Sequence, residues 1–212
     1  MSGKLVLLRH AESTDNAKGH WSGIRNVSLS AKGREDAAKF GLLFRDMQFD
    51  VIYVSQLKRT RQTLQSFLKA YGPTRAVIKK TGAIDERDYG RLAGRDKWAV
   101  RAAVGVRAWT DIRRGWDVPV PDGETLRDVY ERVVPWYREI IVPQLLRGKN
   151  ILIVGHGNSG RALRKYLEHI NDVNIRRTEM DFHMSRIYEV NQRGYATHCI
   201  VRRIRTDKTH LY

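Results

Sequence analysis

The stretch Asn150-Ile151-Leu152-Ile153-Val154-Gly155-His156-Gly157-Asn158-Ser159 decides the fold of this chain. Four of its first five residues are apolar, as in a short buried strand, and a helix is predicted from Asn158 to His169. A buried strand that turns directly into a helix is typical of α/β proteins, in which helices cover a sheet. In such sheets, sites form beyond the carboxyl ends of the strands, which is where His156 stands.

The same alternation of strand and helix continues outward along the 212 residues. Further strands are predicted at Lys4 to Leu8, Asp50 to Val54 and Arg75 to Lys80, and a final hairpin at Arg186 to Val190 and Thr197 to Arg203 around Gly194. Further helices are predicted from a cap at Ser30 to about Met47, from a cap at Ser55 to about Ala70, from Lys97 to Arg113, and from Glu124 to Leu146 with a bend near Pro135 and Pro143. We expect one α/β domain over residues 1–212, with three layers, a mostly parallel central sheet flanked by helices, and a basic C-terminal tail from about residue 201.

Two histidines follow two of these strands at equivalent positions. His10 comes after the first strand beside Arg9, and His156 lies between two glycines. A lone histidine there is more often structural than catalytic, but the matched pair favours chemistry. The segment from Gly155 to Gly160 also fits the G-x-G-x-x-G dinucleotide-binding pattern. It stands near the C-terminus without a clear second strand, so this alternative is weaker.

Composition and charge narrow the function classes. Hydrophobic residues make up 42% of the chain and the longest apolar runs are strand-sized, so a globular protein without a membrane span is expected. No signal peptide is predicted, and the single cysteine excludes an internal disulfide and a multi-cysteine zinc site, so a cytoplasmic location is expected. The net charge of +16 leaves open a nucleic-acid footprint, an anionic membrane surface or a site for a small, highly charged anion. Nucleic acid is not an expected partner, because no motif for it accompanies the charge.

The two histidine segments, Leu8-Arg9-His10-Ala11-Glu12-Ser13 and Gly155-His156-Gly157-Asn158-Ser159, resemble the motifs of the histidine phosphatase superfamily. Within it, the chain is similar to the bisphosphoglycerate-dependent phosphoglycerate mutases. The supporting segments occur in family order: Asn16, Trp21-Ser22-Gly23, Leu29 to Gly33, Ser55 to Thr60, Asp85 to Gly90, Trp109 through Arg113-Arg114-Gly115, and Pro121 to Leu126.

This resemblance implies a fold, an activity and a set of roles. His10 is implied as the phosphorylated nucleophile, Arg9, Arg59 and His156 as its phosphate pocket, and Glu86 as the proton donor and acceptor. The implied substrate contacts include Arg9, Arg59 and Glu86, together with Asn16, Ser22, Gly23, Arg87, Tyr89, Lys97, Arg113, Arg114, Gly157 and Asn158. The resemblance also implies a phosphoglycerate substrate, 2,3-bisphosphoglycerate as priming cofactor and no metal, and it is compatible with a homodimer.

The chemistry gives these residue types a reason to stand together. A histidine attacks phosphorus only when the attacking nitrogen is neutral, and Arg9, Arg59 and a charged His156 are predicted to keep His10 neutral. The same positive groups would stabilise charge on the phosphoryl oxygens. One carboxyl group, Glu86, can move the proton of the reacting hydroxyl in both directions.

Three departures from the family pattern stand out. Ala11 occupies a position that is usually Gly, and its methyl group is expected to alter the turn or narrow the pocket. The chain between Arg114 and Glu124 is short, as in compact bacterial forms. The family's Gly-Val-Pro stretch before the final strand is replaced by Asp181-Phe182-His183-Met184-Ser185-Arg186.

Three functions therefore remain to be compared. The leading hypothesis is a mutase that interconverts 3-phosphoglycerate and 2-phosphoglycerate through phospho-His10. The second is a phosphatase of the same fold, in which water receives the phosphate of a small phosphorylated metabolite. The third is a non-catalytic polyanion-binding module. It would bind RNA or DNA with an affinity that falls as salt rises and that survives His10→Ala.

Overall fold

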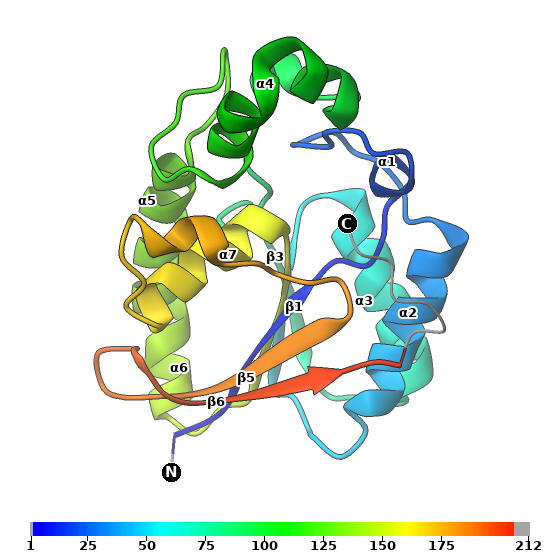
Figure 1. The fold of residues 1–212 in the computed structure, drawn as a ribbon. Helices are drawn as coiled ribbons and strands as arrows, with labels where there is room; N and C mark the ends of the chain where they lie inside the picture. The colour runs from blue at the N-terminus through cyan, green and yellow to red at the C-terminus, as the bar shows by residue number, and fades with distance from the viewer. Residues whose placement is uncertain (1, 206–212) are drawn as a thin grey trace.

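Six strands form one sheet in a computed structural model that describes residues 2–205. Their bounds are Leu5–Arg9 (β1), Val51–Ser55 (β2), Val77–Thr81 (β3), Ile151–Gly155 (β4), Met184–Val190 (β5) and Ala196–Arg203 (β6). They lie in the order β3-β2-β4-β1-β5-β6; the first four run parallel, and β5 is antiparallel to both of its neighbours. This arrangement confirms the predicted α/β fold with a mostly parallel central sheet (Figure 1).

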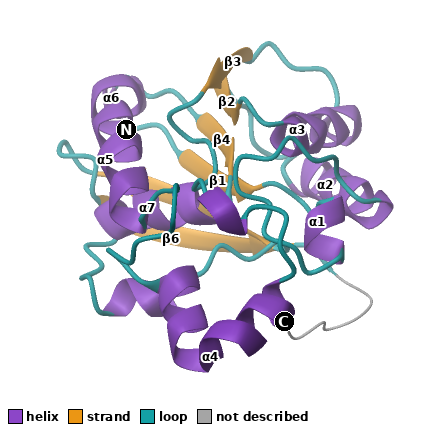
Figure 2. Cartoon of the chain, turned by 90° about the horizontal axis from the view of Figure 1, so that it is seen from above, coloured by secondary structure: helices purple, strands orange, loops and turns teal. Residues whose placement is uncertain are grey.

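Helices cover both faces of this sheet. Figures 1 and 2 show α2 and α3 on one side, α5, α6 and α7 on the other, and α4 beyond the end at which β1 leaves the sheet. The bounds are Thr14–Ala17 (α1), Ala31–Leu43 (α2), Lys58–Tyr71 (α3), Lys97–Arg114 (α4), Leu126–Trp136 (α5), Val142–Leu146 (α6) and Gly157–Leu167 (α7), with short 3-10 turns at Gly90–Leu92 and Asn174–Arg177 and a π-helical turn at Tyr137–Ile141.

Alternate side chains of the central strands enter two separate hydrophobic cores. Leu5 and Leu7 of β1 belong to the core that includes residues of α5, α6 and α7, whereas Val6 and Leu8 belong to the core formed with α2 and α3. A strand buried on both faces needs apolar residues at every position, which explains why the strand sequences show no polar alternation. One core fills the space between the sheet and α5, α6 and α7, and the other fills the space between the sheet and α2 and α3, which gives three layers.

The register of the sheet brings the two histidines together. β1 and β4 pair in parallel with Arg9 opposite Gly155. Both strands end at these residues, so His10 and His156 leave the sheet side by side, with their ring centroids 5.0 Å apart. The His10 backbone N–H donates to the Gly155 carbonyl at 2.9 Å, which extends the pairing by one more hydrogen bond.

Two predicted helix features differ in the structure. Ser30 caps α2 as expected, but Ser55 does not cap α3, which begins at Lys58 without a side-chain cap. The predicted continuous helix from Lys97 is broken inside α4 at Gly105, whose φ of +81° is far from helical values. Glycine adopts this left-handed backbone without the steric cost that a Cβ would add.

The predicted long helix after Glu124 becomes three pieces. Thr125 caps α5 and exchanges hydrogen bonds with Asp128 in a capping box. The π-helical turn then separates α5 from α6, between Pro135 and Pro143. Proline lacks the N–H that an α-helix needs in its interior, so the predicted bend near these residues is confirmed.

The basic C-terminal tail predicted from about residue 201 begins inside the last strand. Its first three residues belong to β6, and Arg202 forms hydrogen bonds of 2.6 and 2.7 Å with the two carboxylate oxygens of Asp46. The side chain of Ile204 enters the core beneath α2 and α3. Residues 206–212, the rest of the predicted tail, lie outside the described residues. Within residues 2–205, no helix combines the length and the apolar character that crossing a bilayer requires.

Candidate active site

His10 is held in one orientation at the end of β1. Its Nδ1 lies 2.7 Å from the Ala11 carbonyl oxygen, and the Arg59 Nε–H donates to its Nε2 at 3.2 Å. A carbonyl only accepts and a guanidinium only donates, so the proton sits on Nδ1 and Nε2 carries the lone pair. Burial, followed by the charges of Arg59 and Arg9, holds the pKa of His10 well below its usual value. The imidazole is therefore neutral at pH 7.

His156 stands behind His10 and is also neutral. Burial comes first, and Arg59 second, in holding the pKa of His156 well below its usual value. The prediction of a charged His156 was therefore wrong: the low pKa of His10 comes from burial and from the arginines. The Nε2 atom of His156 lies 2.7 Å from Ser55 Oγ, which explains why Ser55 does not cap α3. Its Nδ1 atom is buried without a partner among the described residues.

Arg59 connects His10 to the loop after α1 through hydrogen bonds. It is fully buried, and while its Nε–H points at His10, its two terminal nitrogens donate to the carbonyls of Arg25 and Gly23 at 2.9 and 2.8 Å. Gly23 has a φ of +49°, and a Cβ there would lie 3.2 Å from the Tyr89 backbone nitrogen. Glycine suits this close approach, which lets the loop pass over the arginine.

Three side-chain donors of residues that line the cavity have no acceptor within residues 2–205. Arg9 donates one terminal N–H to the Met180 carbonyl at 2.7 Å, but its buried Nε has no partner, and neither do the buried Nε1 of Trp21 and Oγ of Ser22. Burial lowers the pKa of Arg9 to about 10, so the group is still a cation at neutral pH. Unsatisfied buried donors are costly, and oxygens of a bound anion are acceptors that such donors could use.

Glu86 is fixed at the N-terminus of α7. Its Oε1 accepts hydrogen bonds from the Asn158 backbone N–H and side-chain amide, both at 3.0 Å, and from the Arg87 N–H at 2.8 Å. Among the described residues, its Oε2 accepts only the Gly157 N–H, at 3.1 Å. Oε2 thus keeps capacity to accept a proton from a bound hydroxyl.

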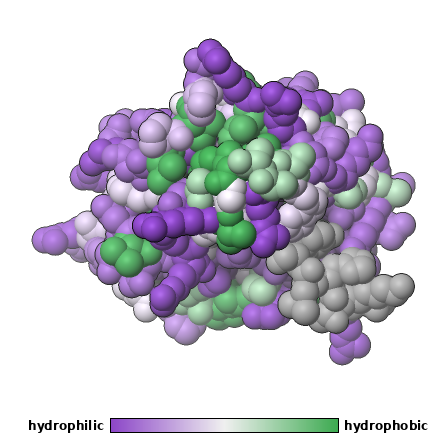
Figure 3. Space-filling view, turned by 45° about the horizontal axis from the view of Figure 1, so that its top comes forward, coloured by the Kyte–Doolittle hydropathy of each residue, from purple (hydrophilic) through white to green (hydrophobic). Residues whose placement is uncertain are grey.

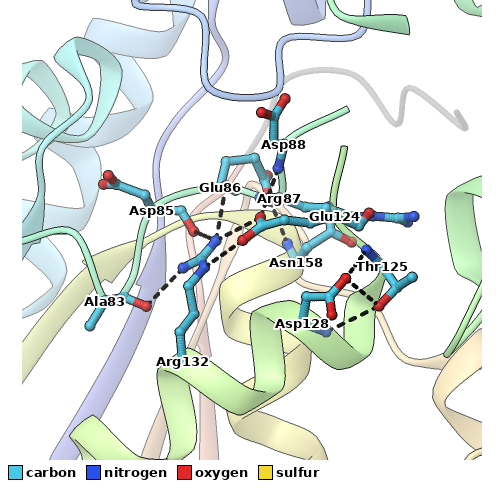
Figure 4. Close-up of polar contacts among 10 residues, drawn as sticks. All are labelled: Ala83, Asp85, Glu86, Arg87, Asp88, Glu124, Thr125, Asp128, Arg132 and Asn158. Atoms are coloured by element: carbon cyan, nitrogen blue, oxygen red, sulfur yellow. Dashed lines mark hydrogen bonds and ion pairs between the residues drawn. The ribbon is translucent and has the colours of Figure 1, made fainter. Parts of the chain in front are cut away.

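An arginine that sequence reasoning missed supports the loop that carries Glu86. Arg132 of α5 donates to the carbonyls of Ala83, Asp85 and Glu86 at 2.9–3.1 Å (Figure 4). Its guanidinium also grips both carboxylate oxygens of Glu124, at 2.9 and 3.1 Å. One guanidinium therefore holds the backbone on the N-terminal side of the Glu86 side chain.

The far wall of the cavity carries three cations from α4. Lys97 and Arg113 are largely buried, and burial followed by repulsion from Arg113 lowers the pKa of Lys97 to about 8. Arg113 stacks on the Trp109 ring, with its Cζ 4.3 Å from the ring centroid. Arg114 pairs with Glu179. This helix exposes Trp98, Val104 and Val106, and Figure 3 shows hydrophobic residues gathered on this face within a mainly hydrophilic surface.

The structure brings most of the predicted site residues around one cavity. The predicted residues that line it are Arg9, His10, Asn16, Ser22, Gly23, Arg59, Glu86, Tyr89, Lys97, Arg113, Arg114, Gly157 and Asn158. His20, Trp21, Arg161, Glu179 and Met180 also line it and were not predicted. Of these, Arg161 follows Asn158 by three residues on α7, a helical spacing that could have indicated a shared face.

Arg87 does not reach this cavity, so the expectation of a substrate contact is corrected. Its side chain is fully buried, and it donates to the carbonyls of Glu124, Ile112 and Val118. Three backbone carbonyls occupy all of its donor nitrogens, so the side chain joins the segment after α4 to the start of α5. An arginine next to Glu86 in the sequence is equally compatible with a contact to substrate and with a structural support of this kind.

The methyl group of Ala11 does not narrow the cavity, contrary to expectation. Ala11 is buried, is not one of the lining residues, and packs in a small apolar cluster with Leu29 and Ala37. Its backbone N–H donates to Thr63 Oγ1 at 3.1 Å, which holds the turn after His10.

His10, Glu86 and His156 also form a cluster of the kind that can hold a metal ion, with their ligand atoms within 4.8 Å of one another. The environment opposes a dication. The Arg59 guanidinium already occupies the His10 lone pair, and backbone N–H groups occupy the Glu86 carboxylate. Two neighbouring arginines would also repel a cation. The absence of a metal from the reaction stays a prediction.

Comparison with known proteins shows which chains share these features. Residues 5–202 match the family model of the histidine phosphatase superfamily (branch 1). A 2,3-bisphosphoglycerate-dependent phosphoglycerate mutase of Bartonella quintana is 38% identical over 193 residues, which cover 90% of this chain and 94% of the relative. The protein of the same name from Cytophaga hutchinsonii is 36% identical over 189 residues, covering 89% of this chain and 88% of the relative.

Solved structures share the fold at lower sequence identity. A mycobacterial glucosyl-3-phosphoglycerate phosphatase in complex with VO3 has a TM-score of 0.81 at 21% identity, covering 94% of this chain and 97% of that protein. A protein of Escherichia coli that is named as a proposed alpha-ribazole-5'-P phosphatase has a TM-score of 0.77 at 20% identity, covering 99% of this chain and 100% of that protein. These likenesses concern the fold alone.

Proposed function

The chain belongs to the histidine phosphatase superfamily and, within it, to the family of 2,3-bisphosphoglycerate-dependent phosphoglycerate mutases, and on that premise we propose that it interconverts 3-phosphoglycerate and 2-phosphoglycerate through phosphorylated His10. One observation carries the proposal: a neutral, buried histidine whose Nε2 lone pair faces a guanidinium, next to donors that lack an acceptor. A phosphoglycerate brings a phosphate for these donors and a carboxylate for a second cationic group.

The first role belongs to His10 and the two arginines beside it. When substrate binds, the Arg59 Nε–H gives up its hydrogen bond to His10 Nε2 and donates to a phosphoryl oxygen instead. The Arg9 Nε–H, which has no partner in the structure, donates to a second phosphoryl oxygen. Nε2 of His10 attacks phosphorus, while the Nδ1–H keeps its hydrogen bond to the Ala11 carbonyl and so prevents the ring from turning. Charge that develops on the phosphoryl oxygens meets fixed donors in a buried site, which is where electrostatic stabilisation is strongest.

Glu86 moves the proton. Its Oε2 accepts the proton of the substrate hydroxyl as that oxygen attacks the phosphoryl group on His10, and returns it to the leaving oxygen in the opposite direction. The α7 N-terminus and the Arg132-supported loop hold this carboxyl on both sides. The neutral His156 packs beside His10 without lining the cavity, and its Nδ1 carries the proton when Ser55 donates to its Nε2.

Lys97, Arg113 and Arg114 form the second cationic group. They would hold the carboxylate of the substrate at the end of the cavity away from His10, and they would hold the second phosphate of 2,3-bisphosphoglycerate there when it primes the enzyme. That cofactor, when bound, supplies the phosphoryl group that His10 first takes up. The unsatisfied donors of Arg9, Trp21 and Ser22 and this separate cation cluster fit a ligand with two anionic ends.

The decisive experiment mixes purified protein with 3-phosphoglycerate in the presence and absence of 2,3-bisphosphoglycerate. We expect 2-phosphoglycerate to form, with a rate that depends on the bisphosphate, and acid-labile phosphate to appear on His10 by mass spectrometry. His10→Ala should abolish both signals, whereas His198→Ala, the same change on exposed β6, should keep them. Release of inorganic phosphate without 2-phosphoglycerate would refute the mutase in favour of a phosphatase.

A further inference from the structure

Phe182 contacts both the nucleophile and the arginine beside it. Its ring centroid lies 3.6 Å from Cζ of Arg9, so the ring covers one face of the guanidinium. The same ring meets the His10 ring in an edge-to-face arrangement, with centroids 5.8 Å apart. Nothing in the proposed phosphoryl transfer uses this aromatic side chain, and it comes from the segment in which the sequence departs from the family pattern.

The loop that carries Phe182, residues 178–183, is firmly anchored. The carbonyls of Thr178 and Glu179 accept hydrogen bonds from Arg161 at 3.0 Å and from Arg164 at 2.5 Å. At its other end, the His183 N–H donates to Asp181 Oδ1 at 2.6 Å, and the His183 ring approaches the buried Asp36 carboxylate at 3.5 Å.

Gly160 of α7 gives the same loop room to settle. A Cβ at this position would lie 2.7 Å from the Met180 side chain, so only glycine lets Met180 pack here without displacement. The Met180 carbonyl then accepts the hydrogen bond from Arg9. The loop thus reaches Arg9 twice, through a carbonyl in the plane of the guanidinium and through an aromatic ring on its face.

These contacts restrict the direction in which Arg9 can point. A guanidinium donates only in its own plane, and a ring stacked on one face fixes that plane. With one terminal nitrogen held by Met180, the unpartnered Nε is left as a donor toward the cavity. The ring also lies against His10, on the side of the neighbouring surface hollow that Arg9 and Phe182 both line.

We propose that Phe182 is a positioning residue that holds the plane of Arg9 and keeps water from His10, and thereby sets the ratio of phosphoryl transfer to hydrolysis. The inference rests on the proposed phosphohistidine chemistry. In the hydrolytic step, a water oxygen forms a P–O bond, the N–P bond electrons return to Nε2, and one water proton passes to Glu86. Inorganic phosphate leaves, and His10 is neutral again. Excluding water slows this step without slowing transfer to a bound hydroxyl.

Three substitutions separate the two roles of the ring. Phe182→Ala removes both the π face and the bulk, Phe182→Leu keeps apolar bulk but removes the π face, and Phe182→Tyr keeps both. Tyr195→Leu is a matched control, because it removes a ring from the hairpin between β5 and β6 at the opposite end of the sheet.

The first measurement is the half-life of the phosphoenzyme without acceptor, after labelling with radioactive 2,3-bisphosphoglycerate. We expect the half-life to fall about tenfold in Phe182→Ala, because small displacements of groups around a reaction centre change rates by factors of this order. In the other variants the half-life should stay near the value of the unsubstituted protein. The release of inorganic phosphate per 2-phosphoglycerate formed should rise in Phe182→Ala alone. A folded Phe182→Ala protein with an unchanged half-life and product ratio would overturn the proposal that the ring excludes water.

The second measurement is the dissociation constant of vanadate, which needs no phosphoenzyme. Loss of one partly buried cation–π contact is expected to weaken vanadate binding about fivefold in Phe182→Leu and Phe182→Ala. Phe182→Tyr and Tyr195→Leu should bind as the unsubstituted protein does. Unchanged vanadate affinity in Phe182→Leu would refute the role in holding Arg9, even if Phe182→Ala failed to fold. Absence of label on His10 in the unsubstituted protein would instead refute the proposed function, and the vanadate result would still test Arg9.

Discussion

Replacing Arg132 by methionine is expected to disable Glu86 without touching the cavity. The substitution keeps an unbranched side chain on α5 but removes the hydrogen bonds to the carbonyls of Ala83, Asp85 and Glu86 and both contacts with the Glu124 carboxylate. The loop that carries Glu86 then loses the support that Figure 4 shows on this side of the carboxylate. What remains is the attachment of Glu86 to the N-terminus of α7.

The size of the expected loss in unfolding free energy follows from the polar groups that lose their hydrogen-bond partner. Arg132 and Glu124 are about three-quarters buried, at 26% and 27% side-chain exposure, so their pairing is not a surface salt bridge. Leaving one carboxylate and three carbonyls partly buried without their donor should cost about 2–4 kcal/mol of unfolding free energy. A shift of about 1 Å in a proton-transferring group can cost about 100-fold in rate, so kcat should fall by about that factor while KM changes little.

Two assays test this reasoning together. Urea denaturation followed by circular dichroism gives the unfolding free energy, and steady-state kinetics with 3-phosphoglycerate give kcat and KM. Arg127→Met is the matched control: Arg127 also lies on α5 and pairs with Asp117 and Glu131, but it is half exposed and should cost about 1 kcal/mol or less. If Arg132→Met lost the expected stability yet kept kcat within about twofold, Arg132 would support the fold and not the position of Glu86.

Three further predictions concern the walls of the cavity. The pKa of Lys97 is lowered to about 8, so its ammonium loses its proton as pH rises through that value. Because the neutral amine no longer attracts the substrate carboxylate, KM for 3-phosphoglycerate should rise above pH 8, and a pH–KM profile of Lys97→Arg should lack this rise. Ala11→Gly removes a methyl group from an apolar cluster and adds backbone freedom, so denaturation should show a loss of about 1 kcal/mol, whereas a fall in kcat would contradict the packing seen for Ala11. Gly160→Leu would force Met180 out of its place, so we expect a loss of about 1–3 kcal/mol by urea denaturation together with weaker vanadate binding, and unchanged affinity would show that Met180 yields without moving Arg9.

The sequence predicts the elements well where local chemistry decides them. The predicted buried strands lie within about one or two residues of the observed ones, as is usual for element boundaries. Ser30 caps α2 as predicted: its Oγ accepts the Gly33 N–H and donates to Glu12 Oε1. Ser55 shows the limit of that reasoning. Its hydroxyl looks like a cap in the sequence, but the fold brings His156 within 2.7 Å of it, from 101 residues away in the chain. Such a partner cannot be found from local pattern.

Arginines mark the boundary between what could and could not be predicted in the site. Arg9, Arg59, Arg113 and Arg114 were found by resemblance, and all four line the cavity. Arg87 and Arg132 have the same chemistry in the sequence, yet neither lines the cavity, and both donate to backbone carbonyls that distant segments supply. A charged residue on a helix is usually exposed, so only the packed fold distinguishes an internal support from a ligand.

The pairing of Arg9 with Gly155 across β1 and β4 has a consequence for how this chain can change over evolution. The two histidines are neighbours because of a backbone ladder, and among the 145 residues between them Ser55 and Arg59 hold the two rings. Insertions, deletions or wholly new loops elsewhere in this interval can therefore reshape what the cavity admits while the pair of histidines stays in place. Changes in loops alone can thus alter which substrate reaches one and the same pair of rings, and this chain carries such changes in the short segment after Arg114, inside the interval, and in the loop around Phe182, beyond it.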